Sequence, residues 1–290
     1  MWQIDAWQPR PQPGFDLGRL CVLRGAGDLA TAVSCRLVRA GIPVLHLEHP
    51  RPSAVRRSVA FSEAVYRGLQ TVEGLDCRRA ADWSEAQQLL RDCGLALVVD
   101  PEAQLLEQFR PRFLVDAILA KRNLGTHRGM AEICLGLGPG FTAGEDVDAV
   151  IETRRGHDLG RVIYRGTAAP NSGVPGAIGG YAAERVLRAE LSGNFYPLKT
   201  FGDWVEAGET VAEVRQEGGE VWELKTGIAG VIRGMLPEAY PVTPGFKVAD
   251  VDPRREALEH WRRVSDKGRA IAGGVLEALL CLERERGLSC

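Results

Sequence analysis

The sequence contains no apolar run of the roughly 18 residues that a membrane-spanning helix needs. An excess of one charge is missing too, because 36 Lys and Arg residues stand against 38 Asp and Glu residues and leave a net charge of −2. Neither a nucleic acid nor a membrane surface is therefore expected as a partner. Residues 1–19 are polar, contain prolines and lack the apolar centre of a signal peptide, so we expect a loose N-terminal arm there.

Paired cysteines are also missing. The seven cysteines are an odd number, and no two of them have the C-x-x-C spacing. This pattern disfavours both a disulfide framework and a zinc site, and no metal site is expected. Reduced thiols are typical of a cytoplasmic protein.

The common catalytic signatures do not occur either. The sequence has no G-x-S-x-G elbow, P-loop or H-E-x-x-H motif, and it has no Tyr-x-x-x-Lys pair that would serve a hydride-transfer enzyme as proton donor. Whether the chain is an enzyme therefore stays open at this point.

What the sequence does contain is an alternation of strand and helix patterns over residues 20–130. Residues 28–41 carry apolar side chains at helical spacing, and Gly41 is a natural helix end. Such alternation predicts an α/β fold with a Rossmann-like parallel sheet, and residues 20–130 would form its nucleotide- or cofactor-binding domain.

The second half of the sequence does not continue this alternation of strand and helix patterns. Residues 131–194 are rich in glycine and are predicted to connect the two halves, and residues 255–290 are predicted to be a C-terminal helical segment. Within residues 195–254, "GDWVEAGETVAEV" and "AYPVTPGFKVADV" form a near-repeat. This repeat predicts a small barrel-sandwich-like barrel of the biotinyl and lipoyl type, without the carrier lysine of those domains.

The stretch "LRGAGDLAT" has the G-x-G-x-x-A spacing of a phosphate-binding turn. Gly25 permits the tight turn, Gly27 lets backbone approach a phosphate, and Ala30 lets the helix pack on the strand. Asp28 is unusual in the first helical turn, where it either caps the helix or repels a pyrophosphate. Glu48 is the acidic residue at the end of the next predicted strand. A purely structural turn is the alternative interpretation.

Basic and polar residues follow at two later strand ends. Arg56 and Arg57 could supply forks for a phosphate, or they could form a solvated basic surface. In "DAILAKRNLGT", Asp116, Lys121 and Asn123 could face a ligand at the edge of the sheet, or they could cap the strand and its surface.

A fourth group combines a glycine turn with titratable side chains. Gly138, Gly140 and Phe141 belong to "GLGPGF", whose backbone N–H groups could form an anion nest. The stretch "VIETRRGHDLG" then adds further candidates, namely Glu152, Arg154 and His157. A lone histidine is more often structural than functional, so His157 remains open.

Together these phrases resemble the YqeB family, whose members are accessory proteins of selenium-dependent molybdenum hydroxylases. The matching phrases cover roughly residues 20–280 in order, and they include "RGAGDLAT", "RRSVAFSEAVY", "DAILAKRNLGT", "VIETRRGHDLGRVI", "PNSGVPG", "VADVDPR" and "SDKGRAIAGGVLEA". The resemblance implies a role in maturing such a hydroxylase, and it supplies no catalytic residue. Given the selenium that it implies, Cys134 is the one thiol that we would test as a carrier of selenium.

Three hypotheses follow. In the first, the α/β domain holds molybdopterin or its cytidine dinucleotide, while the barrel and the C-terminal helix dock the client hydroxylase, other maturation proteins or a second copy of the chain. In the second, the chain is an NAD(P)-dependent oxidoreductase, in which Glu48 binds the ribose and Arg51 or Arg56 favours NADP. In the third, the chain is an interaction scaffold whose glycine loops are structural.

Overall fold

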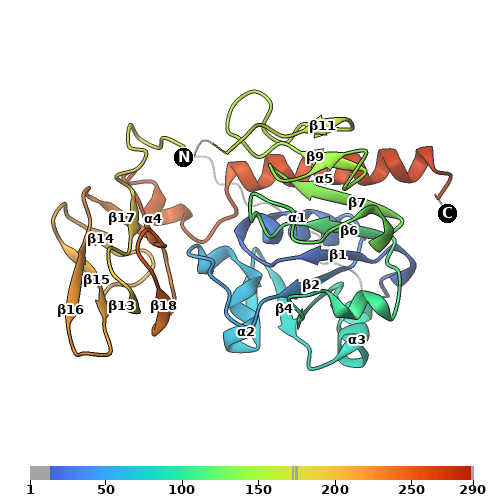
Figure 1. Cartoon of the computed structure of the whole chain (residues 1–290). Coiled ribbons are helices and arrows are strands. Elements are labelled where there is room, and N and C mark those ends of the chain that lie inside the picture. Colours follow the sequence, from blue (N-terminus) through green and yellow to red (C-terminus); the bar gives the residue numbers. More distant parts are fainter. Residues whose placement is uncertain (1–13, 172, 174–175, 289–290) are drawn as a thin grey trace.

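The structure is a computed structural model that describes residues 14–171, 173 and 176–288. The predicted arm over residues 1–19 falls largely outside the described residues. Figure 1 shows two lobes. The α/β lobe combines residues 14–167 with the helix Asp266–Glu285, and the β lobe comprises residues 186–252.

The α/β lobe is built on a nine-stranded sheet with the order β10-β9-β7-β6-β1-β2-β5-β4-β3. The seven inner strands of this order, from β9 through β7, β6, β1, β2 and β5 to β4, run parallel to one another. At the two edges, β10 pairs antiparallel with β9, and β3 pairs antiparallel with β4. The strands are β1 (Cys21–Arg24), β2 (Val44–Glu48), β3 (Leu69–Val72), β4 (Leu75–Arg79), β5 (Leu95–Val99), β6 (Phe113–Asp116), β7 (Ile133–Leu137), β9 (Ala149–Ile151) and β10 (Val162–Ile163). A separate two-stranded sheet pairs β8 (Thr142–Ala143) with β11 (Gly166–Thr167).

Helices cover both faces of this sheet because its strands are apolar on both sides. Leu23 of β1 packs in the core with α1 (Asp28–Arg39) and α5 (Asp266–Glu285), whereas its neighbour Val22 packs in the core with α3 (Trp83–Cys93). The shorter helices are α2 (Ala64–Arg67), α4 (Ala257–His260) and five 3-10 turns at Leu17–Arg19, Arg57–Val59, Phe61–Glu63, Gln104–Glu107 and Arg128–Met130.

Helix α5 lies close against the sheet because small residues form its inner face. A Cβ placed on Gly274 would stand 1.9 Å from the carbonyl oxygen of Gly160, and one on Gly268 would stand 2.8 Å from the Cβ of Ala32 in α1. The last long helix of the described chain therefore completes the core around the first one. Gly41 has a φ of +81° and follows α1, which confirms its predicted place at the helix end.

The β lobe consists of two four-stranded antiparallel sheets, β12-β19-β17-β14 and β16-β15-β13-β18. Its strands are β12 (Val186–Arg188), β13 (Gly193–Pro197), β14 (Trp204–Val205), β15 (Thr210–Arg215), β16 (Val221–Lys225), β17 (Gly230–Met235), β18 (Tyr240–Val242) and β19 (Lys247–Asp252). The near-repeat places β14 and β19 in one sheet and β15 and β18 in the other. Its matching Val-Ala-x-Val positions are buried in one shared core.

The predicted fold class, a Rossmann-like parallel sheet with a barrel-sandwich-like barrel, is wrong. The large sheet is mixed, and the two sheets of the β lobe share no strand pairing among the described residues, so no barrel closes. The physical reason is that two sheets packed face to face bury the alternating valines of the repeat as well as a closed barrel does. Side chains alone make the contact between the two sheets.

The segments also divide differently from the predicted domains. Residues 131–194, predicted to be a connecting region, contribute β7, β9 and β10 to the large sheet and β12 to the β lobe. The predicted C-terminal helical segment over residues 255–290 contains α5, which packs with α1 in the core of the α/β lobe rather than in the core of the β lobe. No helix within the described ranges is long and apolar enough to cross a membrane.

Candidate functional site

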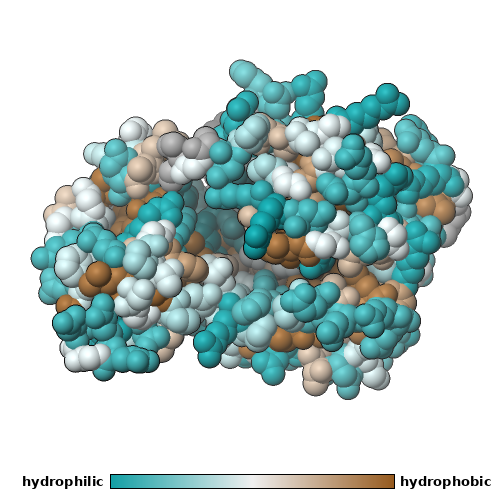
Figure 2. Space-filling view, in the orientation of Figure 1, coloured by the Kyte–Doolittle hydropathy of each residue, from teal (hydrophilic) through white to brown (hydrophobic). Residues whose placement is uncertain are grey.

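A cavity of about 950 Å³ lies where the two lobes meet, and we call it the interlobe cavity. Figure 2 shows the molecule hollowed between the lobes, with hydrophilic side chains around the hollow. The α/β lobe contributes the start of α1, the start of α5 and the loop over residues 48–56, and the β lobe contributes side chains of β17 and β19. One further wall comes from residues 169–171, 176 and 178.

The first turn of α1 opens into this cavity. Gly27 is the N-cap residue, no side chain from the described part of the chain caps the helix, and a Cβ on Gly27 would meet no atom within 4 Å. The N–H groups of a first helical turn have no partner within the helix and carry the positive end of its dipole. The turn can therefore receive an anion, and Gly27 leaves the room for its approach.

Buried side chains behind the turn hold it in place. The Nδ1 atom of His46 lies 2.8 Å from the carbonyl oxygen of Gly25, and its Nε2 atom lies 2.7 Å from Oγ of Ser34. Burial lowers the pKa of His46 to about 4, so the ring is neutral at pH 7. Gly25 has a φ of +96°, which only a glycine adopts readily.

Glu48 serves the same turn. One carboxylate oxygen accepts a hydrogen bond from the N–H of Ala26 at 2.7 Å, and the other accepts one from the N–H of His49 at 2.7 Å. Burial raises the pKa of Glu48, and these two bonds oppose that rise. The geometry therefore gives Glu48 a positioning role toward the turn, whereas the oxidoreductase hypothesis requires it to bind a ribose.

The lining of the interlobe cavity is strongly cationic. Eight Arg or Lys residues stand against the three carboxylates of Asp28, Glu48 and Asp250. The eight cations are Arg51, Arg56, Arg154, Arg155, Arg185, Arg233, Lys247 and Lys267. Within the part of the chain that the structure describes, Arg51, Arg154 and Lys267 form no salt bridge. An excess of positive charge in a concave site attracts anions.

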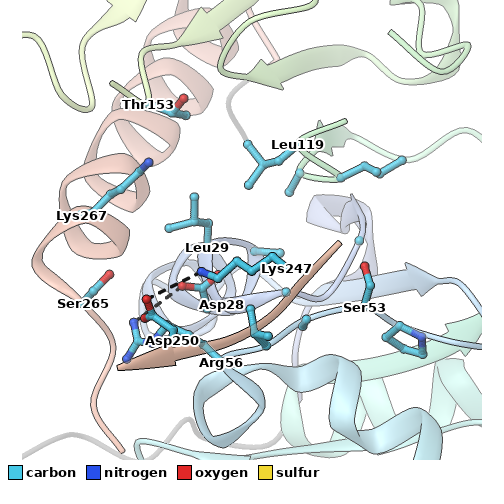
Figure 3. A pocket seen from close by; sticks show the side chains of 18 of the residues that line it. Asp28, Leu29, Ser53, Arg56, Leu119, Thr153, Lys247, Asp250, Ser265 and Lys267 are labelled. Carbon is cyan, nitrogen blue, oxygen red and sulfur yellow. Dashed lines mark ion pairs between the residues drawn. The ribbon is translucent and has the colours of Figure 1, made fainter. Parts of the chain in front are cut away.

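Two lysines from different lobes line the cavity, and Figure 3 shows Lys247 beside Asp28 and Asp250 and Lys267 extending from α5 toward Thr153. Lys267 belongs to the first turn of α5, and Lys247 begins β19. Burial lowers the pKa of Lys267, and the carboxylate of Asp28 opposes this effect. Burial likewise lowers the pKa of Lys247, opposed chiefly by Asp250 at 3.8 Å. Burial removes part of the hydration of both amino groups, and contact with an anionic ligand would offset this loss.

The β lobe holds its cations in place through a buried carboxylate. Asp250 is 1% exposed and accepts hydrogen bonds from Nη1 of Arg185 at 2.5 Å and from Nε of Arg233 at 2.9 Å. Arg233 also reaches Asp252 at 3.0 Å. The nearby positive charges lower the pKa of Asp250 despite its burial. These arginines are therefore fixed in direction and line the cavity as part of a rigid network.

The predicted site residues divide into three groups. The interlobe cavity brings together Gly25, Gly27, Asp28, Ala30, Glu48, Arg56 and Arg154. Asp28 lies 3.6 Å from Arg56, so its negative charge is partly balanced where an anion would approach.

Other predicted residues support the walls from behind. Asp116 is 2% exposed, accepts a hydrogen bond from Oγ1 of Thr126 at 2.6 Å and accepts another from the N–H of Ile118, which lines the cavity. Glu152 accepts hydrogen bonds from the N–H groups of Arg154 and Ala169, two further lining residues. Neither carboxylate is among the lining residues, and each orients a loop that is.

The remaining predicted residues lie outside the cavity lining. Arg57 pairs with Glu63 at 2.5 Å, and the side chain of Asn123 closes its own loop by bonding to the backbone of Thr126. Lys121 and His157 are exposed. Phe141 packs in a core cluster, and the N–H of Gly138 is bonded to Ile151. Gly140 lies so close to Arg122 that a Cβ would be 2.7 Å from its backbone nitrogen.

The described cysteines and carboxylates offer no centre for a metal. No cluster of three or more metal-ligating side chains occurs within residues 14–171, 173 and 176–288. Cys134 is buried in β7, and burial raises the pKa of its thiol to about 11. A thiol in this state is a poor nucleophile at neutral pH, which disfavours Cys134 as a selenium carrier.

Sequence reasoning missed several lining cations, namely Arg155, Arg185, Arg233, Lys247 and Lys267. One signal for Lys267 was available. A lysine in the first turn of a helix is opposed by the helix dipole, and such local conflicts often mark functional positions. The β-lobe cations carried no such signal, because only the packing of the lobes brings them to the cavity.

No protein-family model matches the chain. The chain is 47% identical over 264 residues to the uncharacterized protein YqeB of Escherichia coli strain K12, and the alignment covers 91% of this chain and 48% of that protein. The chain therefore spans about half the length of this relative.

Two solved structures overlap with most of the chain at low similarity. They are a succinylglutamate desuccinylase/aspartoacylase from Rhodobacter sphaeroides, with 14% identity, TM-score 0.28 and coverage of 84% of this chain and 87% of that one, and an aspartoacylase family protein from Mesorhizobium loti, with 12% identity, TM-score 0.30 and coverage of 84% and 86%. TM-scores this low carry no argument about function, and the strand order by itself corrects the predicted fold class.

Proposed function

The chain belongs to the YqeB family, and on that premise we propose that it assists the maturation of a selenium-dependent molybdenum hydroxylase by holding a phosphate-bearing cofactor. Molybdopterin or its cytidine dinucleotide is the proposed ligand. The relative itself is uncharacterized, so the proposal draws its chemistry from the site and from the sequence resemblance.

The observation that carries the binding proposal is the charge of the interlobe cavity. Eight Arg or Lys side chains line it, and two of the three carboxylates opposing them, Glu48 and Asp250, are already hydrogen-bonded within the protein. The uncapped start of α1 points into the same space. A ligand with several phosphate oxygens satisfies these donors better than a neutral or singly charged one does.

The β lobe and α5 have a proposed second role as the docking surface for the client hydroxylase, other maturation proteins or another copy of the chain. The proposed place of action is the cytoplasm, which the free thiols of the described cysteines support. The oxidoreductase alternative finds less support, because Glu48 is engaged by the backbone of the turn.

A binding experiment on the full chain separates these possibilities. We expect pyrophosphate and molybdopterin cytidine dinucleotide to raise the melting temperature, because a ligand that binds only the folded state stabilises it. Stabilisation by NADH or NADPH alone would transfer support to the oxidoreductase hypothesis. Lack of binding by all four compounds would favour the scaffold hypothesis.

A matched pair of lysine variants tests the site. Lys267→Gln should weaken pyrophosphate binding by about tenfold or more, because a charge-assisted hydrogen bond is lost. Lys225→Gln removes a lysine of the β lobe that pairs with Glu223 at 3.2 Å and lies outside the cavity lining, so it should bind as the unmodified protein does. Equal affinities of the two variants, measured by calorimetry, would contradict the proposed site.

The maturation role needs a test in cells. In a strain without this protein, we expect the client hydroxylase to be made at normal level but to contain less molybdenum cofactor and less selenium. Elemental analysis of the purified hydroxylase measures both. Unchanged molybdenum and selenium contents would refute the maturation role while leaving the anion site intact.

A further inference from the structure

A second cavity adjoins the interlobe cavity. It has a volume of about 1420 Å³ and is lined mainly by the segment that links the β lobe to α5, together with residues 177–179. The two cavities share five lining residues, which are Arg56, Arg155, Ile178, Arg233 and Ser265. The shared residues form a wall that a single long ligand could contact from both sides.

The second cavity differs from the first in its charge. Four of its six arginines pair with carboxylates that line the same cavity: Arg269 lies 2.5 Å from Glu73, Arg155 lies 2.7 Å from Asp266, and Asp252 lies 2.9 Å from Arg254 and 3.0 Å from Arg233. The side-chain hydrogen bonds from Arg155 lower the pKa of Asp266 to about 2, so that pair stays ionised at neutral pH. With six arginines against four carboxylates, the second cavity therefore carries a smaller excess of positive charge than the interlobe cavity, and it suits an uncharged polar group better.

A tryptophan distinguishes the lining of the second cavity from that of the interlobe cavity, whose aromatic lining residues include Tyr240 and Phe246. Trp261 is held by Arg262, whose guanidinium carbon lies 4.3 Å from the ring centroid, and by Phe201 at a centroid distance of 6.1 Å. A tryptophan fixed by neighbours in this way is a suitable platform for the ring of a heterocycle. The interlobe cavity has no tryptophan among its lining residues.

Arg56 links the two cavities and has unused hydrogen-bonding capacity. Its side chain is 11% exposed, and its Nε atom is buried without a partner in the described structure. One guanidinium nitrogen lies 3.6 Å from Asp28 on the interlobe side, and the other lies 3.4 Å from the carbonyl oxygen of Arg263 on the other side. Because the guanidinium lines both cavities, a ligand oxygen at the shared wall can accept a charge-assisted hydrogen bond from it.

We propose that one ligand spans both cavities, with its phosphates in the interlobe cavity, an oxygen at Arg56 and an aromatic ring beside Trp261. The ligand class is then a nucleoside diphosphate or a larger molecule that contains one. This inference rests on the proposed function, since it takes the interlobe cavity as the phosphate site, and it adds the second cavity as the site of the base.

Calorimetric titration of the full chain tests the proposal with pyrophosphate and with ADP, GDP, CDP and UDP at one ionic strength. We expect at least one nucleotide to bind about fivefold or more tightly than pyrophosphate, because stacking of a base adds to the phosphate contacts. Trp261→Ala should remove this gain and leave the affinity for pyrophosphate unchanged. No such gain for any nucleotide, or a gain that survives Trp261→Ala, overturns the proposal.

Controls separate the ring site from general effects. Trp222→Ala removes an exposed tryptophan of β16 that lines neither cavity, and it should keep the gain. If Trp261→Ala fails to fold, Ala177→Trp fills the second cavity from an exposed position and should abolish the gain by itself. Failure of pyrophosphate to bind at all counts against the phosphate site, whereas pyrophosphate binding without a nucleotide gain counts against the second cavity alone.

Discussion

At the scale of single residues, Gly27 matters through the atom that it does not have. Its φ of −65° is open to any residue, and its position faces the interlobe cavity with no atom within 4 Å of a built Cβ. A methyl group there would therefore cost the free protein little while occupying the place where a phosphate would approach the helix start.

The corresponding prediction concerns Gly27→Ala. We expect an unchanged free energy of unfolding and a loss of pyrophosphate affinity of about tenfold or more, because close backbone approach is blocked. Gly218→Ala is the control, since Gly218 also lacks a positive φ and has open space around it but lies outside both cavities. Equal binding by the two variants would show that no ligand reaches the turn.

A second prediction at this scale follows from His46. Its pKa is lowered from 6.5 to about 4 in the folded protein by burial. The unfolded chain therefore takes up this proton first as the pH falls, and the free energy of unfolding should decrease between about pH 6.5 and pH 4, by up to about 3 kcal/mol. Above this window the contribution of His46 is constant.

Urea unfolding of the unmodified protein and of His46→Gln at several pH values measures this effect. The difference between the two curves should narrow as the pH falls from 6.5 toward 4, because glutamine does not titrate. A difference that stays constant over this range would mean that His46 is charged in the folded protein.

At the scale of elements, two adjacent glycines of α5 differ in the space around them. Gly274 faces the backbone of Gly160, whereas a Cβ on Gly273 would meet nothing within 4 Å. Gly274→Ala should destabilise the protein by about 1 to 3 kcal/mol through overpacking. Gly273→Ala should stabilise it by up to about 1 kcal/mol, since alanine is the better helix former. Opposite signs in urea unfolding are expected, and equal effects would contradict the close packing of α5.

The elements also show what could be predicted from the sequence. Helix α1 and its end before Gly41 were predictable, because periodicity and the conformational freedom of glycine act locally. The near-repeat was visible too, but its closure into a barrel was not determined. Which strands pair depends on contacts between segments distant in sequence, and the same valines are buried in either arrangement.

The whole molecule sets the composition of the site. Asp28 and Lys267 come from the α/β lobe, while Lys247 and Arg233 come from the β lobe, so the interlobe cavity exists only when both lobes are folded and in contact. The sequence predicted the residues of the glycine turn, where spacing carries the signal. It could not predict the partners from β17 and β19, which reach the cavity through the contact between lobes.

This scale supports a prediction about salt. Because the cavity carries an excess of cations, the affinity for pyrophosphate should fall about tenfold or more between 50 and 500 mM KCl, as counter-ions screen the charges. Titrations of the unmodified protein at several salt concentrations measure the slope. Lys267→Gln should give a shallower slope than Lys225→Gln, and a salt-independent affinity would exclude charge as the source of binding.

The packing of α5 on α1 has a consequence for biosynthesis. Helix α1 ends at Arg39 and its partner begins at Asp266, with the β lobe encoded between them. During synthesis on the ribosome, the apolar face of α1 therefore lacks its contact with α5 until nearly all of the described chain has emerged. The β lobe can complete its own core earlier. We therefore expect nascent chains that end before residue 266 to contain a folded β lobe and an incomplete α/β lobe, whose exposed apolar residues chaperones still bind.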